Sequence, residues 1–295
     1  MKFTVEYPVG GPDHDPLLLG RAGVTRVVRR ADELGFDAIA FTEHPAPSLR
    51  WLEAGGHETL DQTSALAFCA AVTERITLMT HLLVLPYHNP FAAAKALTTV
   101  DLLSDGRLVV VAGTGYLKAE FKALGIDFEA RNERFDEALE VMRGVWSQVP
   151  YEFDGAHFRG RDIAHLPRPF QDGGPPILIG GNSALSRRRA ARNHGWSPLL
   201  VSQTVAETTR MPYLSVPDLA RQITEVRAVA TDPAFMVQVQ GPQTDVLRTA
   251  YDVTAHRDHL GELAEAGVDS FVLQLPCASV DEAVDGLDRF ASDFL

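Results

Sequence analysis

The sequence predicts an α/β protein: a single (β/α)₈ barrel with inserted loops, formed by residues 1–295 as one domain. Strand-like and helix-like segments alternate about eight times along the chain, which favours parallel strands joined by helical crossovers. Several strand-like segments are apolar at nearly every position, as expected for strands buried on both faces. The length of 295 residues exceeds the roughly 250 residues of a typical barrel, so there is room for enlarged loops.

Periodicity and turn residues predict the first four strand–helix cycles. Residues 20–34 repeat apolar side chains at intervals of three and four, the spacing of an amphipathic helix, and Gly35 ends that helix. Residues 76–85 read as a fully buried strand, after which Asn89 and Pro90 provide a helix cap and a first-turn proline. The predicted strands of this half span residues 2–7, 37–41, 76–85 and 107–112, and the helices span 20–34, 62–72, 90–103 and 133–146.

The second half continues the same alternation after an insertion. Residues 148–174 are longer than an ordinary loop and contain an Asp-Gly turn, so we predict a short hairpin over residues 151–158, after the fourth strand and fourth helix. Residues 44–60 and 202–213 are also longer than ordinary loops, and their parts 51–60 and 202–213 are expected to cover the mouth of the barrel. The predicted strands of this half span residues 176–179, 198–201, 235–239 and 270–275, and the helices span 184–193, 216–229, 258–266 and 280–294.

Composition excludes several classes of partner. The chain has 27 basic and 39 acidic residues, and its formal charge of −12 argues against nucleic acids and anionic membrane surfaces as partners. No apolar run reaches the roughly 18 residues of a membrane span, and the first residues lack a signal-peptide pattern. We therefore expect a cytoplasmic protein. Cys69 lies in an apolar run and Cys277 follows a strand-like segment, so both are expected to be buried thiols rather than a disulfide or a nucleophile.

Polar and glycine residues follow the predicted strands at the end where barrel enzymes carry their active sites. Because the carboxyl ends of the strands meet at one face of the barrel, these residues are expected to converge there. They are Glu6, Thr42-Glu43-His44, Thr80-His81-Leu82, Gly113-Thr114-Gly115-Tyr116, Gly180-Gly181-Asn182-Ser183, Gln240 and Gln274.

The glycine-containing turns have both a functional and a structural interpretation. Small residues in Gly180-Gly181-Asn182-Ser183 let backbone N–H groups approach a phosphate at the start of a helix. The same segment also fits a tight turn with Ser183 as a helix cap. Gly113-Thr114-Gly115 lacks the third glycine of a dinucleotide fingerprint, because Lys118 stands there, and close strand–helix packing explains its glycines equally well.

The sequence resembles the bacterial luciferase-like family of flavin and deazaflavin enzymes over nearly the whole chain. Three longer segments carry this resemblance. Residues 75–90, RITLMTHLLVLPYHNP, resemble the third strand and loop of that family. Residues 103–116, followed by Glu120-Phe121, resemble its fourth strand and turn. Residues 175–183, PPILIGGNS, with the stretch 190–196, resemble its phosphate-binding turn. The combination is most similar to the subset that uses coenzyme F420, a 5-deazaflavin.

The resemblance implies an oxidoreductase that transfers a hydride between F420 and a small, uncharged organic substrate. One alternative is an FMN-dependent monooxygenase, which would use reduced flavin, dioxygen and a flavin reductase as partner. Another alternative is a barrel that binds flavin without catalysis. The resemblance also implies a homodimer. One branch of the family carries an acidic residue directly after the Gly-Thr-Gly turn, but Tyr116 stands there, so sugar-phosphate oxidation by that mechanism is not expected.

The resemblance also assigns residues to the site. Glu43-His44 matches a carboxylate–histidine pair that contacts the cofactor, and His44 is the expected catalytic residue in proton transfer, the alternative being a solvent-facing loop histidine. The peptide bond between His81 and Leu82 is expected to be cis. The role of Glu6 stays open. The expected cofactor-binding residues are Glu43, His44, His81, Leu82, Gly113, Thr114, Gly115, Gly180, Gly181, Asn182 and Ser183.

Metal binding is not expected, and the remaining charged clusters have ordinary interpretations. His256 and His259 flank Asp258 and are interpreted as part of a solvated helix start rather than as metal ligands. Arg187-Arg188-Arg189 is interpreted as a solvated helix face, although one arginine of this type can reach a phosphate or carboxylate of a cofactor.

Overall fold

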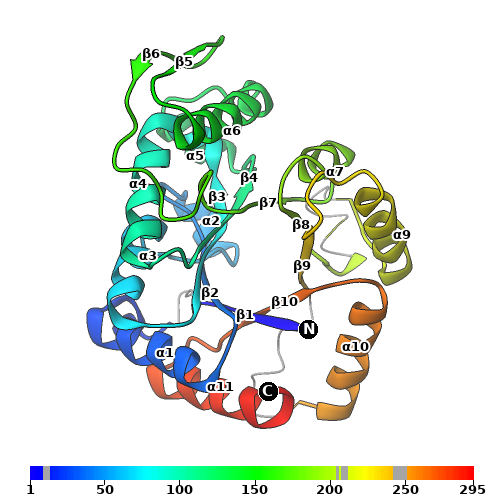
Figure 1. Ribbon diagram of the computed structural model, residues 1–295. Coiled ribbons are helices and arrows are strands. Elements are labelled where there is room, and N and C mark those ends of the chain that lie inside the picture. The colour runs from blue at the N-terminus through cyan, green and yellow to red at the C-terminus, as the bar shows by residue number, and fades with distance from the viewer. Residues whose placement is uncertain (9–13, 204–205, 207–211, 242–250) are drawn as a thin grey trace.

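A computed structural model describes all residues except 9–13, 204–205, 207–211 and 242–250. Eight parallel strands form a closed barrel in the order β1-β10-β9-β8-β7-β4-β3-β2 (Figure 1), which confirms the predicted (β/α)₈ barrel. The first and last strands pair along their whole length, from Lys2 opposite Ser270 to Glu6 opposite Gln274. The barrel strands are β1 (Lys2–Glu6), β2 (Ala38–Phe41), β3 (Thr77–Val84), β4 (Leu108–Gly113), β7 (Ile177–Gly180), β8 (Gly195–Ser197), β9 (Met236–Gln240) and β10 (Ser270–Gln274).

Helices surround the barrel, and side chains at their first turns explain where many of them begin. Asn89 caps α4 through Phe91 N–H, Asp61 caps α3 through Ser64 N–H, and Ser279 caps α11 through Glu282 N–H. The helices are α1 (Arg21–Leu34), α2 (Leu49–Glu53), α3 (Gln62–Val72), α4 (Pro90–Leu103), α5 (Lys118–Ala123), α6 (Arg131–Ser147), α7 (Ala184–Ala190), α9 (Val216–Arg227), α10 (Val253–Glu265) and α11 (Val280–Phe294).

The predicted hairpin lies outside the barrel (Figure 1). Strand β5 (Tyr151–Asp154) pairs antiparallel with β6 (Arg159–Ile163), so the hairpin exists, but its second strand begins later than expected. The carboxylate of Glu137, on α6, accepts hydrogen bonds from the N–H groups of Ala156, His157 and Phe158. These bonds hold residues 156–158 as a connecting loop and exclude them from the strand.

Two predicted elements are displaced. The sixth barrel strand was expected at residues 198–201, but β8 is Gly195–Ser197, and Leu199 forms only an isolated bridge with Gln240. Pro198 has no N–H to donate, which is consistent with the strand ending before it. The helix expected at 258–266 begins earlier, at Val253, because Asp252 caps it through the N–H groups of Thr254 and Ala255.

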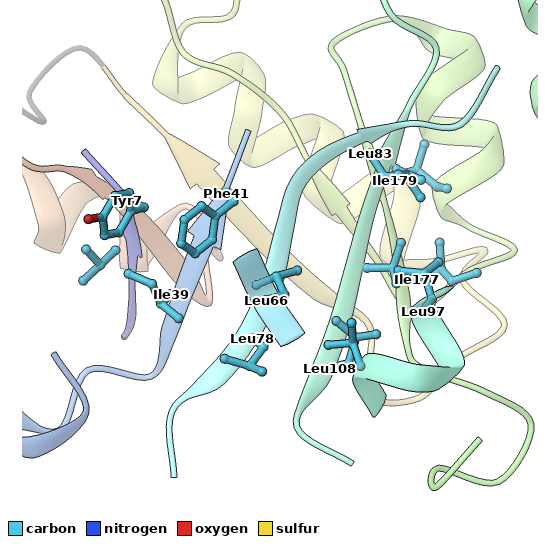
Figure 2. Close-up of a cluster of buried hydrophobic side chains, with 14 of the residues drawn as sticks. Tyr7, Ile39, Phe41, Leu66, Leu78, Leu83, Leu97, Leu108, Ile177 and Ile179 are labelled. Carbon is cyan, nitrogen blue, oxygen red and sulfur yellow. The ribbon is translucent and has the colours of Figure 1, made fainter. Parts of the chain in front are cut away.

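The main hydrophobic core lies between the strands and the surrounding helices. Figure 2 shows part of it, where Leu66 of α3 and Leu97 of α4 lie with strand residues such as Leu78 and Leu108. All four of these side chains are fully buried. Burial of this kind contributes about 25 cal/mol for each Å² of apolar surface removed from water, so packing of helix on strand holds the barrel closed.

The interior of the barrel has two different halves. The strands β2, β3, β4 and β7 contribute an apolar cluster made of Ala38, Ala40, Met79, Val111 and Leu178. The strands β1, β9 and β10 contribute polar side chains instead: the hydroxyl of Thr4 lies 3.0 Å from Oε1 of Gln238 and 3.2 Å from the hydroxyl of Ser270. The barrel is therefore a packed structure and not a pore.

Within the described part of the chain, none of the helices is long and apolar enough to cross a membrane. Cys69 and Cys277 are both free thiols; Cys69 is buried as expected, whereas Cys277 is only partly buried. Burial raises the pKa of the Cys69 thiol to about 12. Cys69 is therefore an inert buried thiol at neutral pH.

Candidate active site

A cavity of about 460 Å³ opens at the carboxyl ends of the strands. Every residue that the sequence assigns to the site lines it, although these residues come from four different strand ends. Glu6, whose role was left open, and Tyr116 line the same cavity. The site residues that the structure brings together are Glu43, His44, His81, Leu82, Gly113, Thr114, Gly115, Gly180, Gly181, Asn182 and Ser183.

Leu82 and two glycines form the floor of this cavity. A Cβ atom added at Gly113 would lie 2.6 Å from Cδ1 of Leu82, and one added at Gly180 would lie 2.6 Å from Cδ2 of the same side chain. Both glycines therefore make room for Leu82. The peptide bond between His81 and Leu82 is cis, as expected, and the pairing of β3 with β4 shifts register between His81 and Leu83.

The turn Gly180–Ser183 combines a strained backbone with a capped helix. Gly181 has a φ of 108°, which favours glycine, and its N–H donates to the carbonyl of Ser197. The hydroxyl of Ser183 accepts from the N–H of Ser186, so its capping role is confirmed. The first backbone bond of α7 runs from Arg187 N–H to Ser183 C=O, which leaves the N–H groups of the first turn without helical partners.

Asn182 joins this turn to the next strand end. Its Nδ2 group donates to the carbonyls of Leu199 at 2.7 Å and Pro212 at 3.1 Å, while its Oδ1 accepts from the N–H of Leu199 at 2.9 Å. Because both the NH₂ group and the oxygen of its amide are hydrogen-bonded, Asn182 holds the turn Gly180–Ser183 to Leu199 and Pro212 at the wall of the cavity.

His44 is held by Glu120, a residue that the sequence did not assign to the site. Nδ1 of His44 lies 3.2 Å from Oε2 of Glu120, and the two side chains are only 10% and 1% exposed. The ring of Trp51 lies against His44 with centroids 4.4 Å apart. The alternative of a solvent-facing loop histidine is therefore wrong.

Glu120 stays ionised although it is buried. Burial alone would raise the pKa of this carboxyl, but hydrogen bonds and charge from His44, the hydroxyl of Tyr87 at 3.0 Å and the N–H of Ala46 hold it below the ordinary value. The pair can therefore take up a proton from a ligand in the cavity.

Glu43 does not pair with His44, although the two are neighbours in sequence. Its Oε2 accepts from the N–H of Val84 at 2.5 Å and its Oε1 lies 2.6 Å from Nε2 of His88. Burial would lower the pKa of His88, but the bond to Glu43 and its charge raise the pKa above the ordinary value. Glu43 therefore anchors the end of β3, and the histidine it engages is His88.

A second carboxylate–imidazole pair lies at the end of β1. Oε2 of Glu6 is 2.9 Å from Nδ1 of His81 and 3.2 Å from Nε2 of Gln240, and Oε1 accepts from Nε2 of Gln274 at 3.0 Å. Burial would raise the pKa of Glu6, but hydrogen bonds from His81 and Gln274 and the charges of His81 and His57 lower it below the ordinary value.

His57, on the long loop before α3, lies between the two pairs. Its Nε2 is 3.2 Å from the hydroxyl of Thr42, and its ring meets that of His44 edge-on at 4.9 Å. Burial and the charge of His44 lower its pKa, while the charges of Glu6 and Glu120 oppose that shift. His57 is therefore a polar group on the wall of the cavity.

The arginine cluster and the helical histidines differ from their interpretations. Arg189 is buried and forms a two-bond ion pair with Asp136 at 2.6 and 2.8 Å, so this part of α7 is not a solvated face. Arg187 donates to the carbonyl of Asn182 at 3.0 Å, behind the turn Gly180–Ser183. His256 lies within α10, buried against Phe271 and Phe290, and not at a solvated helix start.

No group of three potential metal ligands gathers anywhere in the described ranges. Glu120, His57 and Tyr87 are the main polar residues of the site that sequence reasoning missed. Glu120 follows a recognised turn by only a few residues, but nothing in its spacing points to His44, which precedes it by 76 positions. Only the closed barrel brings the two together.

Comparison with known proteins gives the family. Residues 9–239 match the family described as luciferase-like monooxygenase. An FMNH(2)-dependent dimethylsulfone monooxygenase of Pseudomonas putida is 33% identical over 143 residues, which are 48% of this chain and 38% of that protein. An F420-dependent glucose-6-phosphate dehydrogenase of Nocardia farcinica is 34% identical over 172 residues, 55% of this chain and 48% of that protein. The matched segments thus span about half or less of these relatives.

Solved structures show the same fold. A monooxygenase from Streptomyces bottropensis superposes with a TM-score of 0.77 at 24% identity, covering 100% of this chain and 98% of that one. An F420-dependent secondary alcohol dehydrogenase superposes with a TM-score of 0.71 at 17% identity, covering 100% and 98%. The relatives include both FMNH(2)-dependent and F420-dependent proteins, and neither group is clearly nearer. The chain belongs to the luciferase-like monooxygenase family.

Proposed function

We propose that this protein is an F420-dependent oxidoreductase that moves a hydride between the deazaflavin and a small, uncharged organic substrate. The observation that carries the proposal is that His44, on the wall of the cavity, pairs with the buried carboxylate of Glu120. Oxidation of an alcohol by hydride transfer leaves a proton on the substrate oxygen, and a base must remove it.

The geometry of the pair suits that task. Glu120 engages Nδ1 of His44, so Nε2 is the ring nitrogen left to exchange a proton with a ligand. Because Glu120 is ionised, it stabilises the imidazolium that forms when His44 takes up the proton. Trp51 packs against the imidazole and limits the orientations that the ring can adopt.

The chain also offers a fitting site for the cofactor. The cavity volume lies within the roughly 300–1,000 Å³ usual for cofactor sites. Small residues in the turn Gly180–Ser183 and the first-turn N–H groups of α7 suit a phosphate, with Leu82 beneath them. When bound, a deazaflavin supplies hydride chemistry; the protein supplies orientation and proton transfer.

The charge of the cavity supports an uncharged substrate. Two carboxylates line it, those of Glu6 and Glu43, and the carboxylate of Glu120 contacts the lining residue His44, whereas the described part of the lining contains neither lysine nor arginine. A phosphate or carboxylate on the substrate would meet like charge at short range. An alcohol, a ketone or another neutral molecule avoids that repulsion.

A second candidate is an FMN-dependent monooxygenase. Two relatives described as FMNH(2)-dependent dimethylsulfone monooxygenases and the structural likeness to a monooxygenase favour it. This function would require reduced flavin from a partner reductase. A barrel that binds the cofactor without turnover is a third possibility, which the experiment below addresses.

The test is a pair of titrations followed by a turnover assay. Purified protein is titrated with oxidised F420 and, separately, with FMN, and binding is followed by fluorescence. The protein is then incubated with F420 and a panel of primary and secondary alcohols while F420 absorbance is recorded. We expect tighter binding of F420 and bleaching of its absorbance by at least one alcohol. Preference for FMN with oxygen uptake after reduction would support the monooxygenase, and binding without any redox change would support the non-catalytic barrel.

A further inference from the structure

We infer that Trp196 and Arg187 orient two backbone N–H groups of the turn Gly180–Ser183 toward the phosphate of the cofactor, and that Arg187 supplies the positive charge for this phosphate from behind the turn. A phosphate in the cavity needs such support, because the described part of the lining contains neither lysine nor arginine. The inference rests on the proposed function only in requiring that a phosphate-bearing flavin or deazaflavin enters the cavity. It assigns a role to a guanidinium that the proton transfer by His44 does not use.

The carbonyl groups of two consecutive residues in the turn are bound by donors that do not line the cavity. Nε1 of Trp196 donates to the carbonyl of Gly181 at 2.8 Å, and Nη1 of Arg187 donates to the carbonyl of Asn182 at 3.0 Å. Trp196 is fully buried in β8, and the guanidinium of Arg187 lies 5.9 Å from the centre of its ring. The two donors therefore pack on each other and hold both carbonyls on the side of the turn away from the cavity.

Each of these carbonyls shares a planar peptide group with the N–H of the next residue. Both peptide bonds are trans, so C=O and N–H point in opposite directions, and the N–H groups of Asn182 and Ser183 point away from Trp196 and Arg187. Neither N–H has a hydrogen-bond partner in the part of the chain that the structure describes. Both residues line the cavity, so two adjacent N–H groups remain for a ligand that accepts hydrogen bonds.

A buried hydroxyl beside the turn also lacks a partner. Ser197 is 6% exposed, lines the cavity and pairs with Gly180 across β7 and β8. Its hydroxyl forms no hydrogen bond with the described residues, yet they do not enclose it, so it faces the cavity. A buried polar group without a protein partner indicates a ligand atom or a water molecule. Ser197 therefore adds a third donor next to the two N–H groups.

The positive charge of Arg187 is not neutralised by an ion pair with any described carboxylate. Burial lowers the pKa of Arg187 and the charge of Glu225 opposes that shift, but the carboxylate of Glu225 is paired with Arg221 at 2.8 Å. A guanidinium stays protonated at neutral pH in either case. The nearby Arg189, by contrast, is paired with Asp136 at 2.6 Å. An unpaired cation beside free N–H groups favours an anion at that place.

The arrangement separates the cation from the surface that the ligand touches. The hydrogen bond from Arg187 polarises the peptide group between Asn182 and Ser183, which makes the N–H of that group a stronger donor. The charge thus acts through one peptide group, and no cationic side chain enters the space where an uncharged substrate binds. Trp196 and Arg187 are therefore positioning residues, whereas the two N–H groups and the hydroxyl of Ser197 touch the phosphate.

The experiment compares ligands that differ only in the phosphate. Dissociation constants are measured by fluorescence for FMN and riboflavin, and for 5-deaza-FMN and 5-deazariboflavin. For the parent protein we expect at least one of the two pairs to bind, and the phosphorylated member to bind about tenfold more tightly. In Arg187→Gln we expect this preference to fall to about threefold or less, because only the phosphorylated member loses affinity.

A second variant keeps the test valid if Arg187→Gln fails to fold. Trp196→Phe keeps an aromatic ring in the core and removes only the indole N–H, and we expect the preference to fall in the same way. Arg188→Gln is the matched control: it removes the same charge from the next residue, which is exposed and has no ion pair among the described residues, and should keep the parent's ratio.

Three results overturn the inference while leaving the proposed function standing. They are a parent ratio near one, a parent-like ratio in either folded variant of Arg187 or Trp196, and a loss in Arg188→Gln equal to that in Arg187→Gln. Failure of all four ring compounds and of F420 to bind overturns both.

Discussion

At the scale of single residues, three glutamates each engage a histidine around one cavity. Glu120 engages His44, Glu6 engages His81 and Glu43 engages His88, with distances of 3.2, 2.9 and 2.6 Å. All three carboxylates are buried, but the histidines differ: His44 and His81 line the cavity, whereas His88 lies behind Glu43 and is 33% exposed. The same chemical pair therefore serves different tasks, according to what its imidazole faces.

The pair of His44 and Glu120 gives the first prediction. Replacing His44 with alanine removes the proposed base, and we expect turnover to fall by about 10² or more with the fold retained. Glu120→Gln keeps the shape but no longer stabilises the imidazolium, so a smaller loss of about tenfold is expected. Steady-state rates and circular dichroism spectra of the three proteins are the measurements.

His157→Ala is the control for that prediction. His157 also lies near a glutamate, with Nε2 3.4 Å from Glu133, but this pair lies beside the hairpin and away from the cavity. Its removal should leave turnover unchanged. If His44→Ala turns over at nearly the parent rate, His44 has no part in proton transfer.

At the scale of elements, the turn Gly180–Ser183 gives the second prediction. Gly181 has a φ of 108°, and an added Cβ atom would lie 2.9 Å from the hydroxyl of Ser186. Gly181→Val should raise the dissociation constant of the cofactor at least tenfold, about 1.4 kcal/mol, because the turn must open and the phosphate loses its close approach. Titration of the folded variant with F420 and FMN measures this.

Gly125→Val is the control, because it introduces backbone strain at a positive φ without a clash with neighbouring atoms. Gly125 also has a positive φ, 70°, but nothing lies within 4 Å of its added Cβ. This variant should lose stability without a change in the dissociation constant. Equal affinity of the parent and Gly181→Val would rule out the turn as the phosphate site.

Helix α10 gives a third prediction, which concerns pH. Burial and the charge of His259 lower the pKa of His256 to about 4, and its buried Nε2 has no hydrogen-bond partner among the described residues. The unfolded chain, with an ordinary histidine pKa near 6.5, binds the proton more readily. The free energy of unfolding should therefore fall as pH decreases from about 6.5 to 4, by up to about 3 kcal/mol from this residue.

Urea unfolding at pH 7 and pH 5 tests that expectation. His256→Leu cannot titrate, so its free energy of unfolding should change less between the two pH values than that of the parent. His157→Leu, on the partly exposed hairpin loop, should behave like the parent. If the free energy of unfolding changes equally with pH in the parent and in His256→Leu, protonation of His256 is not what destabilises the protein in acid.

The bounds of helices and strands were predictable where residues close in sequence determine them. Asn89, Pro90 and Gly35 mark helix ends through their own backbone chemistry, and α3, α4 and α11 begin and end as the pattern predicts. Strand β8 has only three residues, and its place is set by pairing with β7 and β9, so no local signal reveals it. Glu120 was missed for the same reason, since its partner is distant in sequence.

At the scale of the whole molecule, the two ends of the barrel have different tasks: residues at the carboxyl ends of the strands form the cavity, and residues at the opposite end stabilise the fold. Arg107 lies just before β4, at the end opposite the cavity, and fixes the segment between α3 and β3. Its guanidinium donates to the carbonyls of Ala70, Thr73 and Ile76 and to the hydroxyl of Thr73, at 2.9 to 3.3 Å. If the guanidinium of Arg107 is removed, all of these oxygen atoms lose their hydrogen-bond donor at once.

Arg107→Met gives the fourth prediction. We expect the free energy of unfolding to fall by about 3 kcal/mol, because several partly buried acceptors lose a charged donor. The dissociation constant of the cofactor should not change. Chemical unfolding and titration of the same preparation measure both quantities, and a weakened affinity at unchanged stability would contradict this division.

The packed interior of the barrel has a kinetic consequence. Met79, Val111 and Leu178 close the barrel beneath the floor, so a ligand cannot pass through and must enter and leave at the carboxyl ends of the strands. Where one ligand in such a blind cavity lies over another, we expect the two to bind in a compulsory order. The one that reaches His81 must arrive first and depart last, and a high concentration of the outer ligand delays the departure of the inner one.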